Sequence, residues 1–418
     1  MEKNNLKSYS IKEHQEFDEL KKKELAQLNL IFSDEKYLGL KSDFSVSYFI
    51  GIDWLEENKS YIAVHPKIKK LDYVEMFVKC LKIFFNSKHL KGVYHIYLDK
   101  PEITTSTSDW HITPFLVVHF LNLVEKIVKQ GLKSNYIFKE ENLNNKIKGK
   151  IVLSNQIKKN IVAKREDRIF CRYQEYSTNC PENRLLKKTL LFIQKYSKHF
   201  GGKYPELIQK QNRMLSYFDT VSDEINYSEI KGIKINSLYK EYKEAVELSK
   251  KLLRHFGYSI KNTEIKDEDR KKLPPFYINM AKLFELYVFS LLKNEYYEIK
   301  FQEKCKSQIP DFLLFSDDKK IIIDAKYKPK WKKEIQKEDI LQLSGYARNE
   351  EILSELKIFK ENSNKVVDDN FVVDCIIIYP DIYSNENLKD RDLKESKIEN
   401  FTKFYKCGIR LPQKDLTI

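Results

Sequence analysis

The segment IPDFLLFSDDKKIIIDAKYKPK, residues 309–330, decides the fold of the C-terminal part of the chain. Two apolar runs flank the turn-like stretch SDDKK, and this pattern predicts a β-hairpin. Alternate residues of an extended strand share a face, so Asp324 and Lys326 point the same way while Ala325 packs behind them. A hairpin of this length can set Asp311 beside the pair. The segment therefore predicts two carboxylates and one ammonium on one face of a sheet.

This group of charges has a specific chemical use. Carboxylates bind a hard divalent cation, and an ammonium beside them stabilises the negative charge that develops on a phosphate. The alternative is a hairpin whose charged residues simply face water. Because the charges follow directly on an apolar strand, at the strand end where sites are built, the pattern favours a site.

The elements around the hairpin predict an α/β arrangement. The order is helix, three strands, helix and strand, which is typical of this class. The expected helices cover 276–294 and about 336–348, and the expected strands lie near 297–303, 310–315, 320–326 and 371–379.

The first part of the chain predicts an α+β region in which strands lead. Residues 1–30 are expected to form a charged helical lead-in. Apolar residues at helical spacing predict helices over 73–85 and 111–130. Between about 36 and 100, aromatic and β-branched runs separated by turn residues predict strands at YLGL, FSVSYFIGIDWL, SYIAVHPKI and GVYHIYLD.

The middle of the chain is expected to be mostly helical. PENRLLKKTLLFIQKYSKHF (181–200) is amphipathic, and two more helices are expected around 205–219 and 236–256. The polar stretch 259–275, which ends in two prolines, is a candidate linker. The apolar stripe of the helix over 181–200 consists of Leu185, Leu186, Leu190 and Ile193. We therefore expect three domains, covering 1–150 (α+β), 151–264 (mostly helical) and 265–418 (α/β).

The composition favours a polyanionic partner. The chain has 418 residues, and 75 Lys plus Arg against 61 Asp plus Glu give a net charge of +14. A chain this basic is expected to bind nucleic acid. A Lys-rich, solvated surface is the alternative explanation of the same charge.

Several protein classes are not expected. No apolar run is long enough to span a membrane, and the first 25 residues contain no apolar signal region. The six cysteines form no CxxC pair, which favours a reducing cytoplasm over a zinc ribbon or a disulfide framework. The sequence contains neither GxGxxG nor GxxxxGK[ST], so the chain itself is not expected to bind a nucleotide.

The motif Pro310-Asp311 … Asp324-Ala325-Lys326 resembles the PD-(D/E)xK nuclease superfamily, and its 13-residue gap suits a hairpin. The resemblance implies that Asp311 and Asp324 coordinate Mg²⁺, with the Ala325 carbonyl as a further ligand. It implies that Lys326 positions the attacking water and stabilises the charged transition state.

Two neighbouring helices add to this resemblance. Members of the superfamily often carry an acidic residue on the preceding helix, and Glu285 in MAKLFELYVFSLL occupies that place as a possible metal ligand. A solvated helix face is the alternative for Glu285. Gln342 and Tyr346 lie four residues apart on the following helix, as in the subset that includes RecB-like nucleases. The resemblance implies a catalytic part for Gln342, whereas packing on the sheet is the expected role of Tyr346.

The stretch KYKPKWKKEIQK (326–337) contains six lysines interleaved with Tyr327 and Trp331. Lysines neutralise phosphates, and an aromatic ring can lie against a sugar or base. A solvated loop of lysines is the alternative.

Other segments resemble one family, the McrC-type subunits of the 5-methylcytosine restriction system. The segments are IKGKIVLSNQI (147–157), CRYQEYSTNCPENRLLK (171–187), GIDW (51–54), IAVHPKI (62–68) and CIIIYP (375–380). In the second segment the residues that fit are Glu175, Asn179, Pro181, Asn183, Arg184 and Lys187. The resemblance runs from about residue 48 to about 380, and the helices between 200 and 260 have no match.

This resemblance implies a Mg²⁺-dependent endonuclease subunit of a modification-dependent, GTP-driven restriction complex. Its partner would be a McrB-like AAA+ GTPase ring that recognises methylated or otherwise modified double-stranded DNA. Residues 1–150 would dock on the ring and stimulate GTP hydrolysis. Two alternatives stay open: an endonuclease of another system, such as a LlaJI-like one, and a non-catalytic GTPase-stimulating adaptor with a vestigial nuclease fold.

Overall fold

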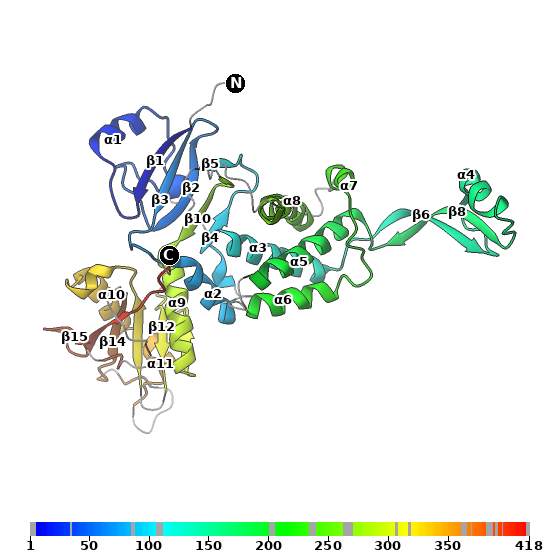
Figure 1. The fold of residues 1–418 in the computed structure, drawn as a ribbon. Coiled ribbons are helices and arrows are strands. Elements are labelled where there is room, and N and C mark those ends of the chain that lie inside the picture. The colour runs from blue at the N-terminus through cyan, green and yellow to red at the C-terminus, as the bar shows by residue number, and fades with distance from the viewer. Residues whose placement is uncertain are drawn as a thin grey trace. The chain divides into compact units, whose positions relative to one another are not determined.

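A computed structural model describes residues 6–33, 36–84, 88–105, 112–199, 205–233, 240–261, 271–305, 308–316, 319–360, 366–368, 370–381, 388, 392–394 and 396–414 (Figure 1). The chain forms two compact units. The first combines Met1–His111 with Asp269–Ile418, and the second is Ile112–Glu268. The mixture of sheets and helices confirms the expected α+β class. No helix within the described ranges is long and apolar enough to cross a membrane.

The first unit contains a five-stranded sheet in the order β1-β3-β2-β10-β4. β1 is parallel to β3, and the other pairs are antiparallel. β10 comes from the C-terminal half of the chain yet lies between two N-terminal strands. Gly51 permits this close approach, since a Cβ there would meet the Phe276 carbonyl oxygen at 2.1 Å. The strands are β1 (Lys7–Lys12), β2 (Phe49–Glu56), β3 (Ser60–His65), β4 (Tyr94–Ile96) and β10 (Phe276–Asn279).

Two expectations for this region are wrong in part. The helical lead-in expected over 1–30 contains β1, and only α1 (Glu19–Ala26) is helical within its described part. Tyr9 and Ile11 alternate with exposed residues in β1, a period of two that the many lysines concealed. The YLGL run begins in a 3₁₀ turn (Lys36–Leu38) rather than a strand. The expected helix over 73–85 is confirmed as α2 (Tyr73–Phe84).

The same unit contains a six-stranded sheet in the order β11-β12-β13-β14-β16-β15. The hairpin expected from residues 309–330 is confirmed, because β12 pairs with β13 in antiparallel register. β13, β14 and β16 are parallel, so their carboxyl ends share one edge. The strands are β11 (Ile299–Phe301), β12 (Phe312–Leu314), β13 (Ile321–Ala325), β14 (Asp374–Pro380), β15 (Ser396–Lys397) and β16 (Phe404–Ile409).

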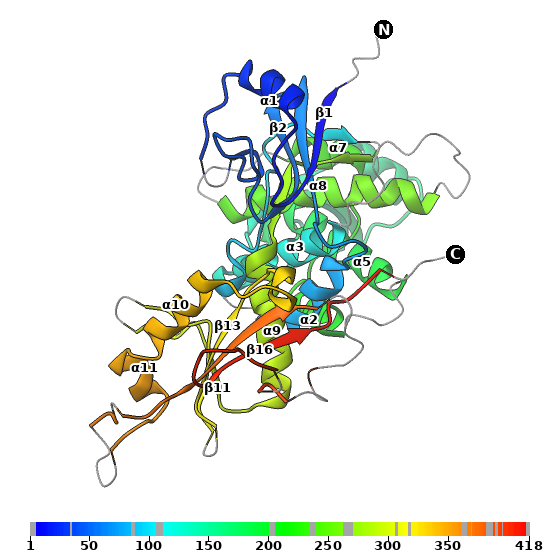
Figure 2. The same cartoon turned by 90° about the vertical axis from the view of Figure 1, so that its left-hand side faces the viewer.

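Helices cover both faces of this sheet (Figure 2). α9 (Met280–Glu295) packs on one face, where the rings of Phe289 and Phe312 stack at 5.8 Å. α10 (Lys337–Tyr346) and α11 (Glu350–Glu355) pack on the other, in a core that contains Ile322, Leu343 and Ile352. The helix expected over 276–294 therefore begins four residues later, because its first residues form β10.

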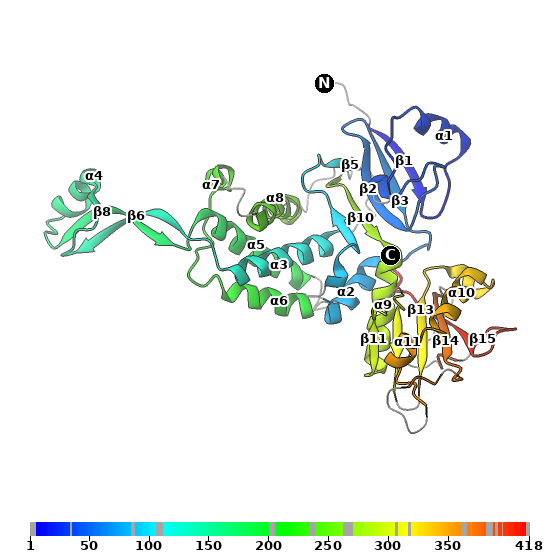
Figure 3. The ribbon, with the colours of Figure 1, turned by 180° about the vertical axis from the view of Figure 1, so that it is seen from behind.

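The second unit consists of helices and a long β-ribbon (Figures 1 and 3). Its expected amphipathic helix is confirmed, with the apolar stripe of α5 fully buried. The helices are α3 (Thr113–Gln130), α5 (Pro181–His199), α6 (Pro205–Ser216), α7 (Tyr227–Gly232) and α8 (Lys240–Lys261).

The ribbon pairs β6 (Asn135–Asn144) with β8 (Arg168–Ser177) over ten positions. The short β7 (Lys150–Ile151) joins β8, and α4 (Leu153–Gln156) with a π-helical turn (Ile157–Ile161) forms the tip. In Figure 3 the ribbon extends away from α3, α5 and α6 of its own unit. A two-stranded ribbon has no second layer to bury its faces.

These units differ from the domains expected at 1–150, 151–264 and 265–418. The 150/151 boundary falls inside β7, and the first and last parts of the chain form one unit. The reason is the pairing of β10 with β2 and β4, a long-range contact that no local pattern reveals. Most of the linker expected over 259–275 lies outside the described residues, and its end forms β9 (Lys271–Leu273), which pairs with β5 (Ile103–Thr105).

Candidate active site

The two aspartates of the hairpin meet at the carboxyl end of β13. Asp324 is only 1% exposed, and Asp311 lies beside it, directly before the neighbouring strand β12. Asp311 Oδ2 accepts a hydrogen bond of 2.8 Å from the backbone N–H of Ala325. The structure therefore brings together both carboxylates that the sequence singled out.

Lys326 links this pair to α10. Its Nζ lies 2.7 Å from Asp324 Oδ2 and donates a 2.8 Å hydrogen bond to Gln342 Oε1. Gln342 Nε2 in turn donates to the hydroxyl of Tyr346 at 2.7 Å. That hydroxyl contacts the Ile309 carbonyl at 3.4 Å. One line of polar contacts thus runs from the sheet edge to the helix and fixes the ammonium.

The electrostatics of the pair favour protons or a cation. Burial raises the pKa of Asp311 well above its usual range, and the negative charges of Asp324 and Glu285 raise it further. Burial also raises the pKa of Asp324, which the Lys326 ammonium opposes. Desolvation lowers the pKa of Lys326, but the neighbouring aspartates outweigh it and the net pKa is raised. Two adjacent carboxylates of this kind bind a cation more readily than they ionise together.

The Ala325 carbonyl is available at the same edge because of the proline in the motif. Register places Ile323 opposite Phe312, so Ala325 lies opposite Pro310. The N–H and C=O of one residue in a strand point to the same neighbouring strand, and the Ala325 N–H points to Asp311. Pro310 has no N–H to donate to the Ala325 carbonyl.

Glu285 reaches the site from α9 and is held by Gln302. Gln302 Nε2 donates to Glu285 Oε1 at 2.5 Å, and Gln302 Oε1 lies 3.3 Å from Nδ1 of His89. Burial raises the pKa of Glu285, and the hydrogen bond from Gln302 opposes this. A cavity of about 720 Å³ opens here, lined in part by Lys91, Lys282 and these residues.

Gln302 and His89 were missed by sequence reasoning, since neither belongs to a motif. Gln302 has a φ of 47°, in the left-handed region that costs a non-glycine residue free energy. This strained backbone directs its amide between His89 and Glu285.

The oxygen donors fit a hard divalent cation such as Mg²⁺, which takes one or two carboxylates and keeps several waters. Asp324 Oδ2 is buried and has the Lys326 ammonium as a charged neighbour at 2.7 Å, and its remaining lone pairs could be shared with a cation. Within the described ranges no three His, Cys, Asp or Glu side chains form a ready metal cluster. The donors that fit are therefore Asp311, Asp324 and the Ala325 carbonyl, with Glu285 next to them.

The aromatic residues of the lysine stretch are not available to DNA, and that expectation is wrong. Trp331 is fully buried and donates through Nε1 to Asp339 Oδ2 at 2.8 Å. Tyr327 is 2% exposed. Lys328 forms an ion pair with the same Asp339 at 2.8 Å. Both rings are therefore part of the core, which the run of lysines around them concealed.

The longest family-like segment, 171–187, connects the ribbon to the helices. Asn183 Nδ2 donates to the carbonyls of Lys133 and Thr178 at 2.9 and 2.7 Å. Lys187 Nζ donates to the carbonyls of Phe218 and Val221 at 2.9 and 2.6 Å. These side chains donate hydrogen bonds to backbone carbonyls, so the segment stabilises the chain around the start of α5.

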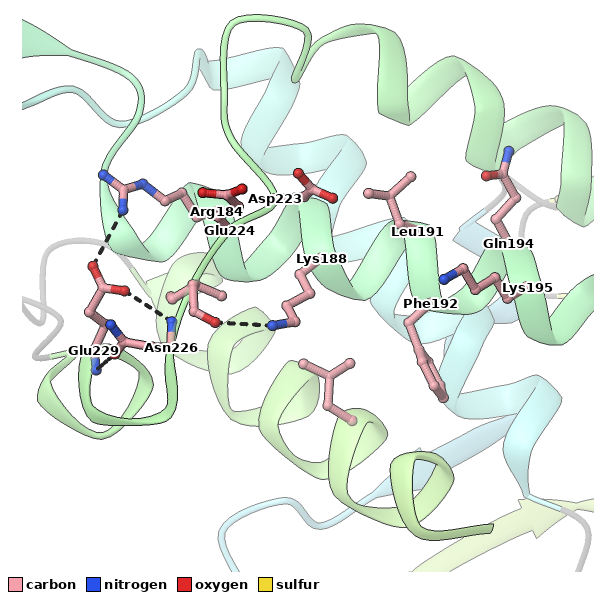
Figure 4. Close-up of a pocket in the computed structure, with 12 residues that line it drawn as sticks. Arg184, Lys188, Leu191, Phe192, Gln194, Lys195, Asp223, Glu224, Asn226 and Glu229 are labelled. Atoms are coloured by element: carbon pink, nitrogen blue, oxygen red, sulfur yellow. Dashed lines mark hydrogen bonds and ion pairs between the residues drawn. The ribbon is translucent and has the colours of Figure 1, made fainter. Parts of the chain in front are cut away.

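Arg184 of this segment borders a cavity of about 940 Å³ between α5, α7 and α8 (Figure 4). Its guanidinium pairs with Glu229 at 3.3 Å, and Lys188 donates to the Ile225 carbonyl at 3.0 Å. Glu229 also closes a capping box with Asn226 at the start of α7. Arg184, Lys188 and Glu229 in Figure 4 therefore hold α7 and the loop before it against α5.

The chain matches the family model described as "McrBC 5-methylcytosine restriction system component" over residues 46–354, about three quarters of its length. This match confirms the expected family. No curated protein matches the chain.

Two solved structures are similar at low scores. One is the refined half-complex from a tetradecameric assembly of Thermococcus gammatolerans McrB AAA+ hexamers with bound McrC, with 13% identity, 96% of this chain and 94% of that chain covered, and a TM-score of 0.37. The other is the cryo-EM structure of the Thermococcus gammatolerans McrBC complex, with 13% identity, 68% and 87% covered, and a TM-score of 0.28.

Proposed function

Since the chain belongs to the family of McrBC 5-methylcytosine restriction system components, we propose that it is the McrC-type subunit and cuts double-stranded DNA with Mg²⁺. The observation that carries the proposal is the line of contacts from Asp311 and Asp324 through Lys326 to Gln342. A hairpin with wet charges would leave these carboxylates exposed, whereas here Asp324 is buried, Asp311 and Lys326 are half-buried, and all three converge at the end of a strand. The α/β sheet between α9 and α10 is the arrangement expected of a PD-(D/E)xK domain.

In this proposal the three oxygen donors hold Mg²⁺, which when bound lowers the pKa of a water and polarises the scissile phosphodiester. The Lys326 ammonium stabilises the negative charge that develops on the phosphate. One such contact contributes about 10²–10³-fold in rate. Gln342 accepts a hydrogen bond from that ammonium and so orients it toward the substrate. Glu285, held by Gln302, would add negative charge next to these donors.

The chain contains no phosphate-binding loop, so in this proposal a separate McrB-like AAA+ ring hydrolyses the GTP. We place the docking surface on the ribbon, part of which lies within the expected docking region 1–150. Nine large apolar side chains are exposed between residues 135 and 177. They are Tyr136, Phe138, Ile147, Ile151, Leu153, Ile157, Ile161, Val162 and Tyr176. Exposed apolar surface of this extent marks a protein interface.

The tip is ordered enough to present these side chains. Asn160 is fully buried there, and its Nδ2 donates to Asn142 Oδ1 and Gln156 Oε1 at 2.9 and 2.8 Å. Gln156 Oε1 also accepts from the Phe170 N–H at 2.6 Å. A satisfied amide network of this kind fixes one arrangement of the tip.

The test uses the full chain with a McrB-like GTPase, GTP, Mg²⁺ and methylated duplex DNA. Asp324→Asn should reduce cleavage by about 10²-fold or more while GTP turnover stays at the wild-type level. Asp374→Asn is the matched control, because Asp374 lies at the opposite end of the same sheet and pairs with Lys394. Cleavage by Asp324→Asn at the wild-type rate would contradict the proposal.

The same assay separates the alternatives. A wild-type chain that stimulates GTP turnover but never cuts DNA is the non-catalytic adaptor. Cleavage that needs neither GTP nor the GTPase indicates an endonuclease of another system.

A further inference from the structure

Three polar side chains meet behind the candidate site, and the chemistry proposed above does not use them. Glu13 follows β1, Lys67 follows β3, and Tyr327 comes directly after Lys326. Glu13 and Tyr327 are almost completely buried. Lys67 belongs to the family-like segment IAVHPKI. The group therefore joins the N-terminal sheet to the strand that carries the site.

The contacts within the group are specific. Glu13 Oε1 accepts from the Tyr327 hydroxyl at 2.9 Å and from the Lys67 N–H at 3.0 Å. Lys67 Nζ donates to the Tyr327 carbonyl at 2.8 Å and lies 3.9 Å from the centre of its ring. Tyr327 is thus held at its hydroxyl, its ring and its carbonyl by residues about 260 or more positions away.

The group also touches the rest of the site. The ring of Phe284, the residue before Glu285 on α9, lies 5.6 Å from the ring of Tyr327. On the other side of Tyr327, the Lys328 N–H donates to the Lys326 carbonyl at 2.6 Å. Fixing Tyr327 therefore fixes the backbone on which Lys326 stands.

Burying the charges of Glu13 and Lys67 removes them from water, which costs free energy. Burial raises the pKa of Glu13 and lowers that of Lys67 to about 8, while their mutual attraction opposes both changes. Glu13 Oε2 has no hydrogen-bond partner among the described residues. Apolar residues of similar size fill a core as well or better, so a role beyond packing accounts for the charges.

We propose that Glu13, Lys67 and Tyr327 form a clamp by which the N-terminal sheet positions the Lys326 ammonium, with Tyr327 as the positioning residue. The part that concerns catalysis rests on the proposed nuclease function. The existence of the clamp does not depend on that function, since it concerns only how the backbone at residues 324–328 is held.

The first arm of the test measures amide hydrogen exchange of the full chain by mass spectrometry, in a peptide that covers 324–331. The double variant Glu13→Gln/Lys67→Met removes both charges together and avoids a lone buried ion. It should exchange at least about threefold faster in this peptide, because local opening sets exchange. Tyr327→Phe, which removes only the hydroxyl, should give a smaller increase.

The chain offers a matched control. Asp53 and Lys100 also form an ion pair of 2.8 Å with a nearly buried carboxylate, and Lys100 lies 3.9 Å from the ring centre of Tyr97. This pair belongs to the N-terminal sheet but has no contact with Tyr327 among those described above. Asp53→Asn/Lys100→Met should leave exchange in the 324–331 peptide unchanged.

The second arm measures DNA cleavage by the complex. The double clamp variant should lower kcat by about tenfold or more, since misplaced catalytic groups cost this much, with KM for DNA and the Mg²⁺ dependence unchanged. A purely structural defect would lower the active fraction and the melting temperature without this kcat-specific loss per folded molecule. Unchanged exchange in the 324–331 peptide would overturn the clamp, whether or not the chain cuts DNA.

Faster exchange with unchanged kcat would overturn the positioning role. A wild-type complex that cuts no DNA would overturn the proposed function, and the exchange arm alone would then decide the clamp.

Discussion

The strand-end site and the ribbon tip distribute polar and apolar groups in opposite ways. At the end of β13, Asp324 is buried and the ionic groups are tied to one another. At the tip, a buried amide network around Asn160 lies inside and apolar side chains such as Leu153 and Val162 face out. Two carboxylates whose pKa values are raised by burial favour a bound cation or substrate. Exposed apolar groups on a rigid support call for a protein.

The long segment 171–187 and the short PD…DxK motif differ in an equally instructive way. Segment 171–187 fits the family pattern at six positions, and its side chains satisfy backbone carbonyls at the base of the ribbon. The five-residue PD…DxK motif carries the candidate chemistry. In this chain the long motif maintains a local backbone arrangement, whereas the short motif carries the candidate chemistry. The candidate site is therefore found from charge and burial rather than from the length of a motif.

The largest effect is expected at Lys326. Lys326→Met removes the charge but keeps most of the side-chain length, so cleavage by the complex should fall about 10²–10³-fold. Lys394→Met is the control, because Lys394 pairs with Asp374 at the other end of the sheet. Rate constants at saturating Mg²⁺ provide the measurement. Equal rates for the two variants would show that Lys326 contributes no more to cleavage than Lys394 at the other end of the sheet.

The next effect concerns the tip. Leu153→Asp/Val162→Asp places charges in the proposed interface, and stimulation of GTP turnover should fall by about tenfold or more, since interface anchors contribute several kcal/mol. Both residues are exposed, so the melting temperature should not change. The control is Leu341→Asp, an exposed position on α10. Retained stimulation in the tip variant, together with its loss in a variant of exposed Leu20 on α1, would move the docking surface to the N-terminal sheet.

A smaller effect is expected at Gln302. Gln302→Gly relieves the left-handed backbone and removes the hydrogen bond to Glu285. Stability should rise by about 1 kcal/mol, while cleavage should fall by about tenfold, the lower end of the range for a lost outer contact to a metal site. Denaturant unfolding and cleavage rates on the same sample measure both. Activity and stability that rise together would show that Gln302 does not support the site.

The smallest effect is on the stability of the metal-free chain. Because the pKa of Asp311 is raised in the folded state, its ionisation disfavours folding as pH rises through that pKa. Asp311→Asn removes this cost and should raise the melting temperature by about 1–3 °C near neutral pH, with the gain over wild type growing as pH rises from the ordinary aspartate range toward the raised pKa. Added Mg²⁺ should stabilise the wild type more than the variant. A gain that shrinks as pH rises would contradict the sign of this coupling.

Sequence reasoning succeeded where the structure is local. The hairpin that joins Asp311 to Asp324 depends on a short turn and two apolar runs, all within 309–330. Lys326 comes at the end of the second strand of this hairpin, and Gln342 lies on the next long helix, α10. Their proximity therefore follows from the order of the elements along the chain. For the same reason the helices α2, α3 and α5 were predicted within a few residues.

It failed where distant segments meet. Nothing near residue 276 indicates that β10 pairs with β2, because the partner strand is more than 200 residues away. Trp331 and Tyr327 stand among lysines, and only the tertiary structure shows that the core and Glu13 cover them. Gln302 was invisible because its importance comes from a backbone conformation rather than a residue pattern.

The pairing of β5 with β9 has a consequence for how this molecule is assembled. Thr105 lies opposite Lys271, so the chain leaves the first unit and returns to it within one antiparallel pair. The helical unit with its ribbon is therefore an insertion, and during synthesis its last residue precedes the strand that completes the N-terminal sheet. The five-stranded sheet can therefore be completed only after β10 has left the ribosome. A short turn from 105 to 271 would join these two strands directly, so the inserted unit is not needed to connect them.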